Sequence, residues 1–279
     1  MPRYPKGGIT KLSELDIDAD KDWGGYTLTN IKKAVAAGEP LSIEQMLALV
    51  AYAWTGGAGE DSCFALIQDT DYVYAGLYDS SPALVIKIAK ATMTVSATWT
   101  GGAGEDFCRA LTQDTDYVYA GLDIFTPPTK VIKIAKATMT TSATWTGGAD
   151  EYGCRALTQD TDYVYAGLDT SPAKVIKIAK ATMTTSATWT GGAGENECFA
   201  LTQDTDYVYA GLHISPAKVI KIAKATMTTS ATWTGGASEN YCDALTQDTD
   251  YVYAGLHISP AKVIKIDARR RFPLFWDVG

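Results

Sequence analysis

Hydrophobic and polar positions recur along this chain with a period of about 44 residues. The string W-T-G-G begins at Trp54, Trp99, Trp145, Trp189 and Trp233, and a cysteine recurs in step with it, at Cys63, Cys108, Cys154, Cys198 and Cys242. Each unit holds four short segments rich in Val, Ile, Thr and Tyr, separated by Gly, Pro or Asp, which is typical of strands joined by turns. No helical period inside the unit competes with this pattern. The sequence therefore predicts an all-β repeat protein with four strands per unit.

The polarity of the four segments changes along each unit. In the third copy, residues 163–168 (Y-V-Y-A-G-L) are apolar on both faces, as expected for a strand covered on both sides. Residues 184–188 (T-T-S-A-T) are polar, which suits an outermost strand at a rim that faces water. A four-stranded unit of about 44 residues is the length of a β-propeller blade, so we expect blades rather than the coils of a solenoid.

The order of motifs resembles the YVTN family of propeller repeats. That family has an A-V-x-x-D-G inner strand, then Y-V-Y-V, then V-x-V-I, then a polar strand. The counterparts here are residues 156–160, 163–165, 175–178 and the Thr/Ser run after Met183. The resemblance covers residues 46–267 and implies a propeller fold, but it implies no activity because propellers host many functions.

Counting the strands predicts five blades. The inner, second and third strands occur five times, whereas the outer strand before W-T-G-G follows only the first four units. Residues 48–54 supply a fifth outer strand ahead of the first unit, so we expect the two ends of the chain to share one blade and close the ring. Residues 272–278 are an alternative closing strand, although Pro273 and three preceding arginines disfavour it.

The segments outside the repeat differ from it in composition. Residues 1–45 are predicted to form a short, partly helical extension, with a capping box at Ser42 and Gln45. Residues 22–46 also resemble a segment of phage tail fibres, although the usual Asp-Ala-Ala is missing; the alternative is a simple cap on the propeller. Residues 268–279 form a basic and then aromatic tail, which we expect to dock on this ring or on a partner subunit.

Composition and charge narrow the function. The net charge of −8 and pI of about 4.8 disfavour nucleic acid or an anionic membrane as partner. No apolar run is long enough to span a bilayer, and the N-terminus lacks the apolar segment of a signal peptide. The chain has two histidines and no recognisable catalytic triad, Walker loop or C-x-x-C pattern. We therefore predict no enzymatic activity, no catalytic residue and no cofactor.

Two acidic patterns and the cysteines have structural explanations. Asp16, Asp18, Asp20 and Asp22 have the alternation of a calcium loop, but Lys21 and Thr27 occupy the positions that require Gly and Glu, so we interpret them as a solvated turn. The repeated Q-D-T-D is interpreted as a hairpin turn rather than a cation site, because Asp caps turn amides. Five cysteines at one equivalent position of a symmetric ring lie too far apart to pair, so we predict small buried side chains and no disulfide.

Differences between the copies fall in two stretches that an up-and-down blade places at the same end. The first flanks the cysteine, and the second follows G-L. The loops of the other end and the outer strands hardly change, whereas simple drift of surface loops would have altered both ends. The predicted ligand-binding residues are Asp61, Ser62, Phe64, Asp106, Phe107, Arg109, Tyr152, Gly153, Arg155, Asn196, Glu197, Phe199, Asn240, Tyr241, Asp243, Phe125, His213 and His257.

These patterns favour a non-enzymatic recognition or adhesion module. We expect a lectin-like module that binds a cell-surface glycan or protein, in the manner of a virion or tail-fibre receptor-binding protein, although the sugar motifs of tachylectin-like propellers are not found. The virion or cell surface is the expected location. A structural subunit of a filament or shell, assembled through residues 1–45 and 268–279, is the alternative; a propeller enzyme is a third.

Overall fold

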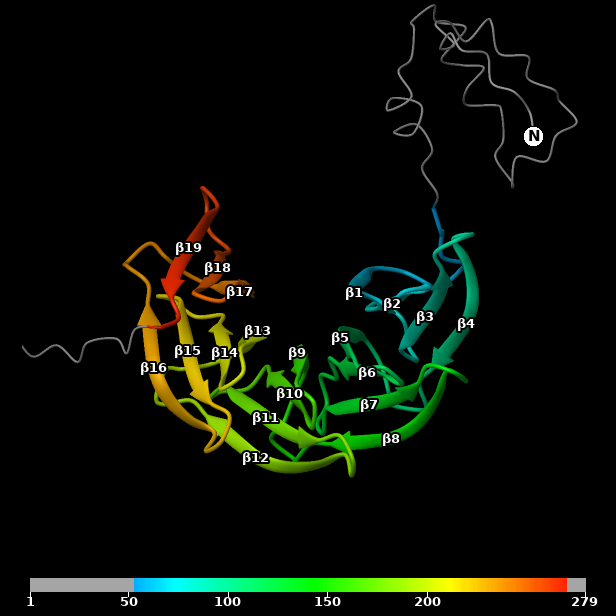
Figure 1. Ribbon diagram of the computed structural model, residues 1–279, viewed down its shortest axis with the longest axis horizontal. Coiled ribbons are helices and arrows are strands. Elements are labelled where there is room, and N and C mark those ends of the chain that lie inside the picture. Colours follow the sequence, from blue (N-terminus) through cyan, green and yellow to red (C-terminus); the bar gives the residue numbers. More distant parts are fainter. Residues whose placement is uncertain (1–52, 270–279) are drawn as a thin grey trace, which may run out of the picture. The chain divides into compact units, whose positions relative to one another are not determined.

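The computed structural model describes residues 53–269, and over this range the chain forms β-strands and turns with no helix. All the strands belong to one unit, Trp54–Gly279. They form four sheets of four strands and a fifth sheet of three, each an antiparallel meander in chain order (Figure 1). The all-β fold of repeated antiparallel sheets that the sequence predicts is therefore confirmed.

The strands coincide with the four predicted segments of each unit. The inner strands are β1 (Cys63–Gln68), β5 (Cys108–Gln113), β9 (Cys154–Gln159), β13 (Cys198–Gln203) and β17 (Cys242–Gln247). The second strands are β2 (Tyr72–Leu77), β6 (Tyr117–Leu122), β10 (Tyr163–Leu168), β14 (Tyr207–Leu212) and β18 (Tyr251–Leu256). The third strands are β3 (Leu84–Ala89), β7 (Lys130–Ala135), β11 (Lys174–Ala179), β15 (Lys218–Ala223) and β19 (Lys262–Asp267). The outer strands are β4 (Thr94–Thr100), β8 (Thr140–Thr146), β12 (Thr184–Thr190) and β16 (Thr228–Thr234).

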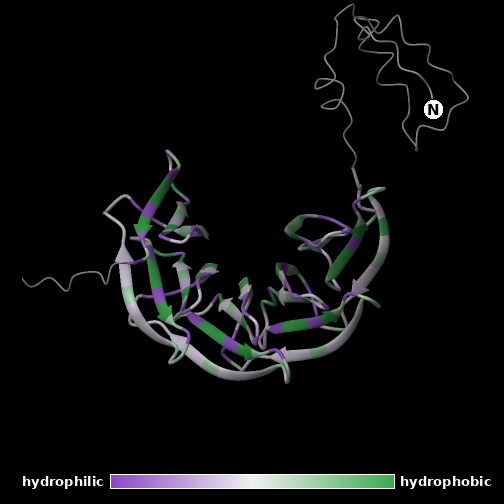
Figure 2. Cartoon of the chain, in the orientation of Figure 1, coloured by the Kyte–Doolittle hydropathy of each residue, from purple (hydrophilic) through white to green (hydrophobic). Residues whose placement is uncertain are grey.

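Successive sheets pack face to face, and the core lies between them. Tyr119, Val131 and Trp145 of the second sheet, for example, contact a cluster of the third sheet that includes Cys154 and Ile176. The second strands are buried on both faces, as their apolar sequence predicts, whereas the outer strands remain largely exposed. Figure 2 shows the same trend: the third strands are mostly hydrophobic with hydrophilic bands, and the outer strands are pale.

Polar side chains also join neighbouring sheets at the end that carries the Q-D-T-D turns. The amide of Gln159 donates to the backbone carbonyl of Gln113 at 2.8 Å, and Nζ of Lys133 donates to the carbonyl of Lys180 at 2.8 Å. Equivalent bonds link the other neighbouring sheets, so the unchanging sequence of this end has a structural cause.

The first aspartate of each Q-D-T-D turn holds the turn together. Oδ1 of Asp160 accepts hydrogen bonds from the backbone amides of Asp162 and Tyr163, and Oδ2 accepts one from the hydroxyl of Tyr165 at 2.8 Å. Nζ of Lys224, from the next sheet, lies 3.4 Å from the same oxygen. The hairpin-turn interpretation is therefore confirmed. Residues 53–269 contain no group of three or more His, Cys, Asp or Glu side chains that could hold a metal ion.

The prediction of a closed five-bladed ring is corrected by the structure. Over residues 53–269 no sheet closes a ring, because the fifth sheet has only β17, β18 and β19, and the first and fifth sheets do not pack against each other. After Ile266 the repeat sequence stops, and no outer strand follows β19 among the described residues. Ala53 and Trp54 are not part of a strand. The rest of the expected closing strand, the alternative at 272–278, the N-terminal extension with its expected helical turn and the acidic turn at Asp16 lie outside the described residues.

The cysteines are free, as predicted, but they are not all alike. Cys108, Cys154, Cys198 and Cys242 are buried, whereas Cys63 in the first sheet is exposed. The prediction of a buried side chain is therefore wrong for Cys63, because no sheet among residues 53–269 precedes the first one and covers it.

Candidate functional site

Both varied stretches lie at the same end of the sheets. Strands alternate in direction, so the segment that enters each inner strand and the loop between the second and third strands emerge together, opposite the Q-D-T-D turns. We call this end the varied end. Its side chains form a chain of contacts that runs from the first sheet to the fifth.

An aromatic cluster joins the first two sheets at the varied end. The rings of Phe64 and Tyr78 lie 4.8 Å apart, Tyr78 and Phe107 lie 5.5 Å apart, and Phe107 meets the edge of Phe125 at 5.4 Å. The guanidinium of Arg109 lies 4.4 Å from the ring centre of Phe64. Phe64 and Phe125 expose more than half of their surface, at 53% and 61%, so the cluster presents aromatic rings to solvent.

An ionic cluster lies at the centre of the varied end. The guanidinium of Arg155 contacts Oδ2 of Asp123 and Oδ2 of Asp169, each at 2.6 Å. The hydroxyl of Tyr78 donates to Oδ2 of Asp123 at 3.1 Å. Asp123 is almost completely buried, and this burial raises the pKa of its carboxyl even though Arg155 opposes the shift. The guanidinium of Arg155 thus forms ion pairs with two carboxylates of the protein itself.

Gly153 is required for this ionic cluster. In the other four units the residue before the cysteine is Ser62, Phe107, Glu197 or Tyr241, each with a left-handed backbone. A Cβ at Gly153 would collide with Oδ1 of Asp123. Glycine at this position therefore makes room for the buried carboxylate, and we interpret Gly153 as a packing residue rather than a ligand contact.

A second aromatic cluster extends over the fourth and fifth sheets. The imidazole of His213 stacks between the rings of Phe199 and Tyr241, at 4.4 and 4.5 Å. Nδ1 of His213 and Nδ1 of His257 lie 2.6 and 3.1 Å from the two carboxylate oxygens of Asp243. The guanidinium of Arg155 lies 5.0 Å from the ring centre of Phe199, which connects this cluster to the ionic one.

The remaining predicted residues have more local roles. Asp106, Asn196 and Asn240 accept hydrogen bonds from Ser81, Ser171 and Ser215 of the preceding loops, so they tie neighbouring loops together. Ser62 donates to Asp79. Asp61 and Tyr152 are exposed, and Glu197 bonds to neighbouring loops through its backbone.

Tyr78, Asp79, Asp123 and Asp169 belong to the site but were not among the predicted residues. Tyr78, Asp123 and Asp169 occupy the position directly after G-L, the same position as His213 and His257 in the last two units. A comparison of this one position across the five units identifies all three residues.

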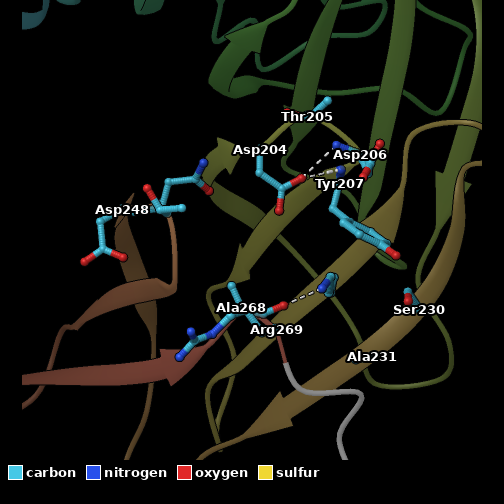
Figure 3. A pocket seen from close by; sticks show the side chains of 12 residues that line it. Asp204, Thr205, Asp206, Tyr207, Ser230, Ala231, Asp248, Ala268 and Arg269 are labelled. Atoms are coloured by element: carbon cyan, nitrogen blue, oxygen red, sulfur yellow. Dashed lines mark hydrogen bonds between the residues drawn. The ribbon is translucent and has the colours of Figure 1, made fainter.

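Three hollows open at the opposite end, between neighbouring sheets. Their volumes are about 740, 760 and 460 Å³. Figure 3 shows the first, which is lined by residues that include Asp204, Tyr207, Asp248 and Arg269. The carboxylate of Asp204 is turned toward the amides of Asp206 and Tyr207, to which it is hydrogen bonded, so its oxygens are already used by the turn.

Comparison with known proteins supports the fold and assigns no activity. No protein-family model and no curated protein matches the sequence. Among solved structures, Kuenenia stuttgartiensis hydrazine synthase is similar with a TM-score of 0.54 and 12% identity, over 74% of this chain and 66% of that one. This chain therefore spans about two thirds of the length of that structure. The computationally designed proteins Ika8 and Ika4 are similar with TM-scores of 0.49 and 0.46 and identities of 14% and 16%. These matches cover 76% and 57% of this chain, and 73% and 90% of the designed chains.

Proposed function

We propose that this chain is a non-enzymatic recognition module whose ligand binds at the varied end. The observation that carries the proposal is that most of the positions at which the copies differ are not scattered. They meet in one contiguous surface in which exposed aromatic rings alternate with guanidinium, imidazole and carboxylate groups. Aromatic and Arg side chains are enriched where proteins bind other molecules, because they give a large contact area at a small cost in conformational entropy.

The ligand class that suits this surface is a cell-surface glycan or protein. Exposed rings such as Phe64, Phe125, Tyr152 and Tyr241 provide flat apolar faces, and Asp243 with its two histidines provides hydrogen-bonding groups beside them. The module, built from repeats that resemble those of the YVTN type, is proposed to act as an adhesin or lectin-like part of a virion or tail fibre at a cell surface. The weak resemblance of residues 22–46 to tail-fibre segments supports that location.

The hollows at the opposite end are a less suitable ligand site. They repeat between neighbouring sheets with nearly the same residues, and their carboxylates already accept bonds from the turn amides and from tyrosine hydroxyls. Three similar hollows whose polar atoms already form internal hydrogen bonds have few free groups with which to distinguish one ligand from another.

The alternative function is a structural subunit of a filament or shell. It is favoured by one observation, the exposure of apolar side chains on the outer faces of the first and fifth sheets, at Leu66, Val95 and Val263. Such residues suit a subunit that is covered by a neighbour.

Binding of the full-length chain to a printed glycan array and to a panel of intact cells tests the proposed function. A variant with Phe64, Phe125, Tyr152 and Tyr241 replaced by Ser serves as the comparison, since these side chains are exposed and their loss should leave the sheets intact. We expect specific signals for the natural chain that disappear with the variant. Equal binding by both proteins, or no binding to any probe, would contradict the proposal.

A further inference from the structure

Neighbouring sheets are joined by a recurring set of contacts, each made by one residue from either sheet. The first and the fifth sheets each carry residues of this set whose partners are missing among the described residues. Within the array, the cysteine of one sheet lies against the glycine of the preceding Y-V-Y-A-G-L strand. A Cβ on Gly76, Gly167 or Gly211 would stand 2.7, 2.7 or 2.6 Å from the sulfur of Cys108, Cys198 or Cys242. Gly255 in the fifth sheet meets no cysteine, and Cys63 in the first sheet is exposed.

The apolar side chains show the same incompleteness. Val263 of β19 is 71% exposed, whereas its counterpart Val219 is 4% exposed because the fifth sheet covers it. Leu66 of β1 is 65% exposed, whereas its counterpart Leu111 packs against the core between the first two sheets. We call the exposed side of the first sheet, around Cys63 and Leu66, the head face. The exposed side of the fifth sheet, around Gly255 and Val263, is the tail face.

The polar groups of the two faces are also complementary. In three of the four contacts between sheets, a lysine after the third strand pairs with the turn aspartate of the preceding sheet, as Lys136 does with Asp69 at 3.4 Å. The corresponding aspartate of the tail face is Asp248, and the corresponding lysine of the head face is Lys90, which here bonds to a carbonyl of its own sheet. Gln68 on the head face likewise matches the glutamines that donate to the preceding inner strand. An acidic group of the tail face therefore corresponds to a basic group of the head face.

Trp54, ahead of the first sheet, is the equivalent of the tryptophan in each outer strand, the strand that the fifth sheet lacks among the described residues. It stands nine residues before Cys63, the same spacing that separates Trp145 from Cys154. It packs against the cluster of Ala75, Leu77, Ile86 and Ile88 on the head face, much as Trp145 packs against the third sheet. On the first sheet, Trp54 thus occupies the place that the tryptophan of a preceding outer strand occupies on the other sheets. The fifth sheet has no outer strand among the described residues and so lacks such a tryptophan.

Two substitutions make the head face more apolar than the internal faces. Leu84 replaces the lysine that elsewhere bonds to a loop glutamate, as Lys130 does to Glu105 at 2.9 Å. Val95 replaces the threonine that accepts a bond from the preceding tryptophan, as Thr141 does from Trp99. Faces between separate subunits of a homo-oligomer are more apolar than the average surface, which fits a contact between two chains.

We propose that the chain associates head to tail, with the head face of a second copy packed against the tail face of the first. In the described structure the two faces of one chain do not meet, so each is available to a neighbour. The second copy would repeat the internal contact between sheets, placing its Cys63 against Gly255 and its Lys90 near Asp248. Because the two faces differ, the contact is heterologous, and it extends the array rather than forming a two-fold dimer.

Sedimentation of the full chain and of two face variants tests this proposal. Leu66→Asp blocks the head face and Val263→Asp blocks the tail face; both side chains are exposed, so each variant should fold. We expect the natural chain to form species larger than a monomer as concentration rises, and each variant alone to remain monomeric. An equimolar mixture of the two variants should give a dimer and nothing larger, since one intact head meets one intact tail. Phe125→Asp, an equally exposed apolar residue off both faces, should associate like the natural chain.

Several results would overturn the proposal. A natural chain that stays monomeric at all concentrations would mean that the faces do not associate between copies. Variants that still associate would place the contact elsewhere, for example at residues 1–45 or 268–279. Variants that melt at clearly lower temperature while remaining monomeric, with no dimer on mixing, would show that the two faces meet within one chain. Ligand binding is measured separately on monomeric Val263→Asp, so failure of this proposal and failure of the recognition function are distinguishable.

Discussion

The sulfur of Cys154 lies 2.5 Å from the point where a Cβ on Gly121 would stand. Glycine in the second strand and cysteine in the next inner strand are therefore two halves of one close contact between sheets. The contact explains why both residues recur in every unit. A larger residue at either position would separate the sheets and expose the core that fills the space between them.

Replacement of Gly121 by Ala should destabilise the protein by about 1–3 kcal/mol, because the added methyl group overpacks the contact with Cys154. In monomeric Val263→Asp, Gly255→Ala is the matched control, since a Cβ there meets only Ala244, at 3.3 Å, and should change stability by less than about 1 kcal/mol. Urea unfolding midpoints measure both effects. Adding Cys154→Ala to Gly121→Ala should recover part of the loss; a purely additive double variant would contradict the contact.

Asp160→Asn should lower stability at neutral pH by about 1–3 kcal/mol, because the carboxylate accepts bonds from two backbone amides and from Tyr165. Burial alone would raise the pKa of Asp160, but these hydrogen bonds outweigh it and hold the pKa below the ordinary value. The ionised carboxylate therefore stabilises the fold above the ordinary Asp pKa, about 3.9, and this contribution is lost as the pH falls through the lowered pKa.

Melting curves at several pH values check this prediction. The difference between the natural chain and Asp160→Asn should be largest at neutral pH and should shrink in acid. Asp162→Asn, at the exposed second aspartate of the same turn, should change stability by no more than about 0.5 kcal/mol. Equal losses for Asp160→Asn and Asp162→Asn would show that the turn is not held by the first carboxylate.

Arg155→Ala should cost about 3–5 kcal/mol, since it leaves the buried carboxylate of Asp123 without its cation. Burial raises the pKa of Asp123, so protonation relieves the unpaired charge and the variant should become relatively more stable as the pH falls. Arg109→Ala removes an arginine from the equivalent position of another unit, where its guanidinium lies over the rings of Phe64 and Tyr78 and forms no ion pair with a carboxylate of residues 53–269, and it should cost less than about 1 kcal/mol. Calorimetry that found equal losses for both would contradict the ionic cluster.

Thiol labelling distinguishes Cys63 from the other four cysteines. In monomeric Val263→Asp, iodoacetamide should modify Cys63 alone, because burial makes the other sulfurs inaccessible and raises their pKa, for Cys242 to about 12. Mass spectrometry should count one label in the native protein and five after unfolding in urea. A disulfide, or labelling of several thiols in the native protein, would disagree with the buried positions.

The strands were predictable from the sequence because five near-identical copies repeat the same turn signals and the same apolar segments. Whether the sheets close into a ring was not predictable, because the repeat sequence does not determine whether the last sheet packs against the first. Val219 and Val263 have the same local sequence around them, yet Val219 is buried by a neighbouring sheet and Val263 is exposed. The difference is one of tertiary contact, which no local pattern contains.

The candidate site was predictable in position but not in its internal pairing. The placement of both varied stretches at one end follows from strand alternation alone. That Arg155 serves the buried Asp123, and that Gly153 makes room for it, depends on side chains from different loops whose distances a sequence does not give. Sequence reasoning therefore treated Arg155 as a ligand anchor, whereas the structure shows it bound to two carboxylates.

The dissociation constant for a ligand found on the glycan array or cell panel shows whether recognition takes place at the varied end. It is measured for the natural chain, for the variant with Phe64, Phe125, Tyr152 and Tyr241 replaced by Ser, and for a matched variant of the opposite end. The matched variant carries Asp71→Asn, Asp116→Asn, Asp162→Asn and Asp206→Asn. Loss of several aromatic anchors should weaken binding by about 100-fold or more, while the matched variant binds like the natural chain. Equal affinities for all three proteins, or a loss confined to the matched variant, would contradict recognition at the varied end.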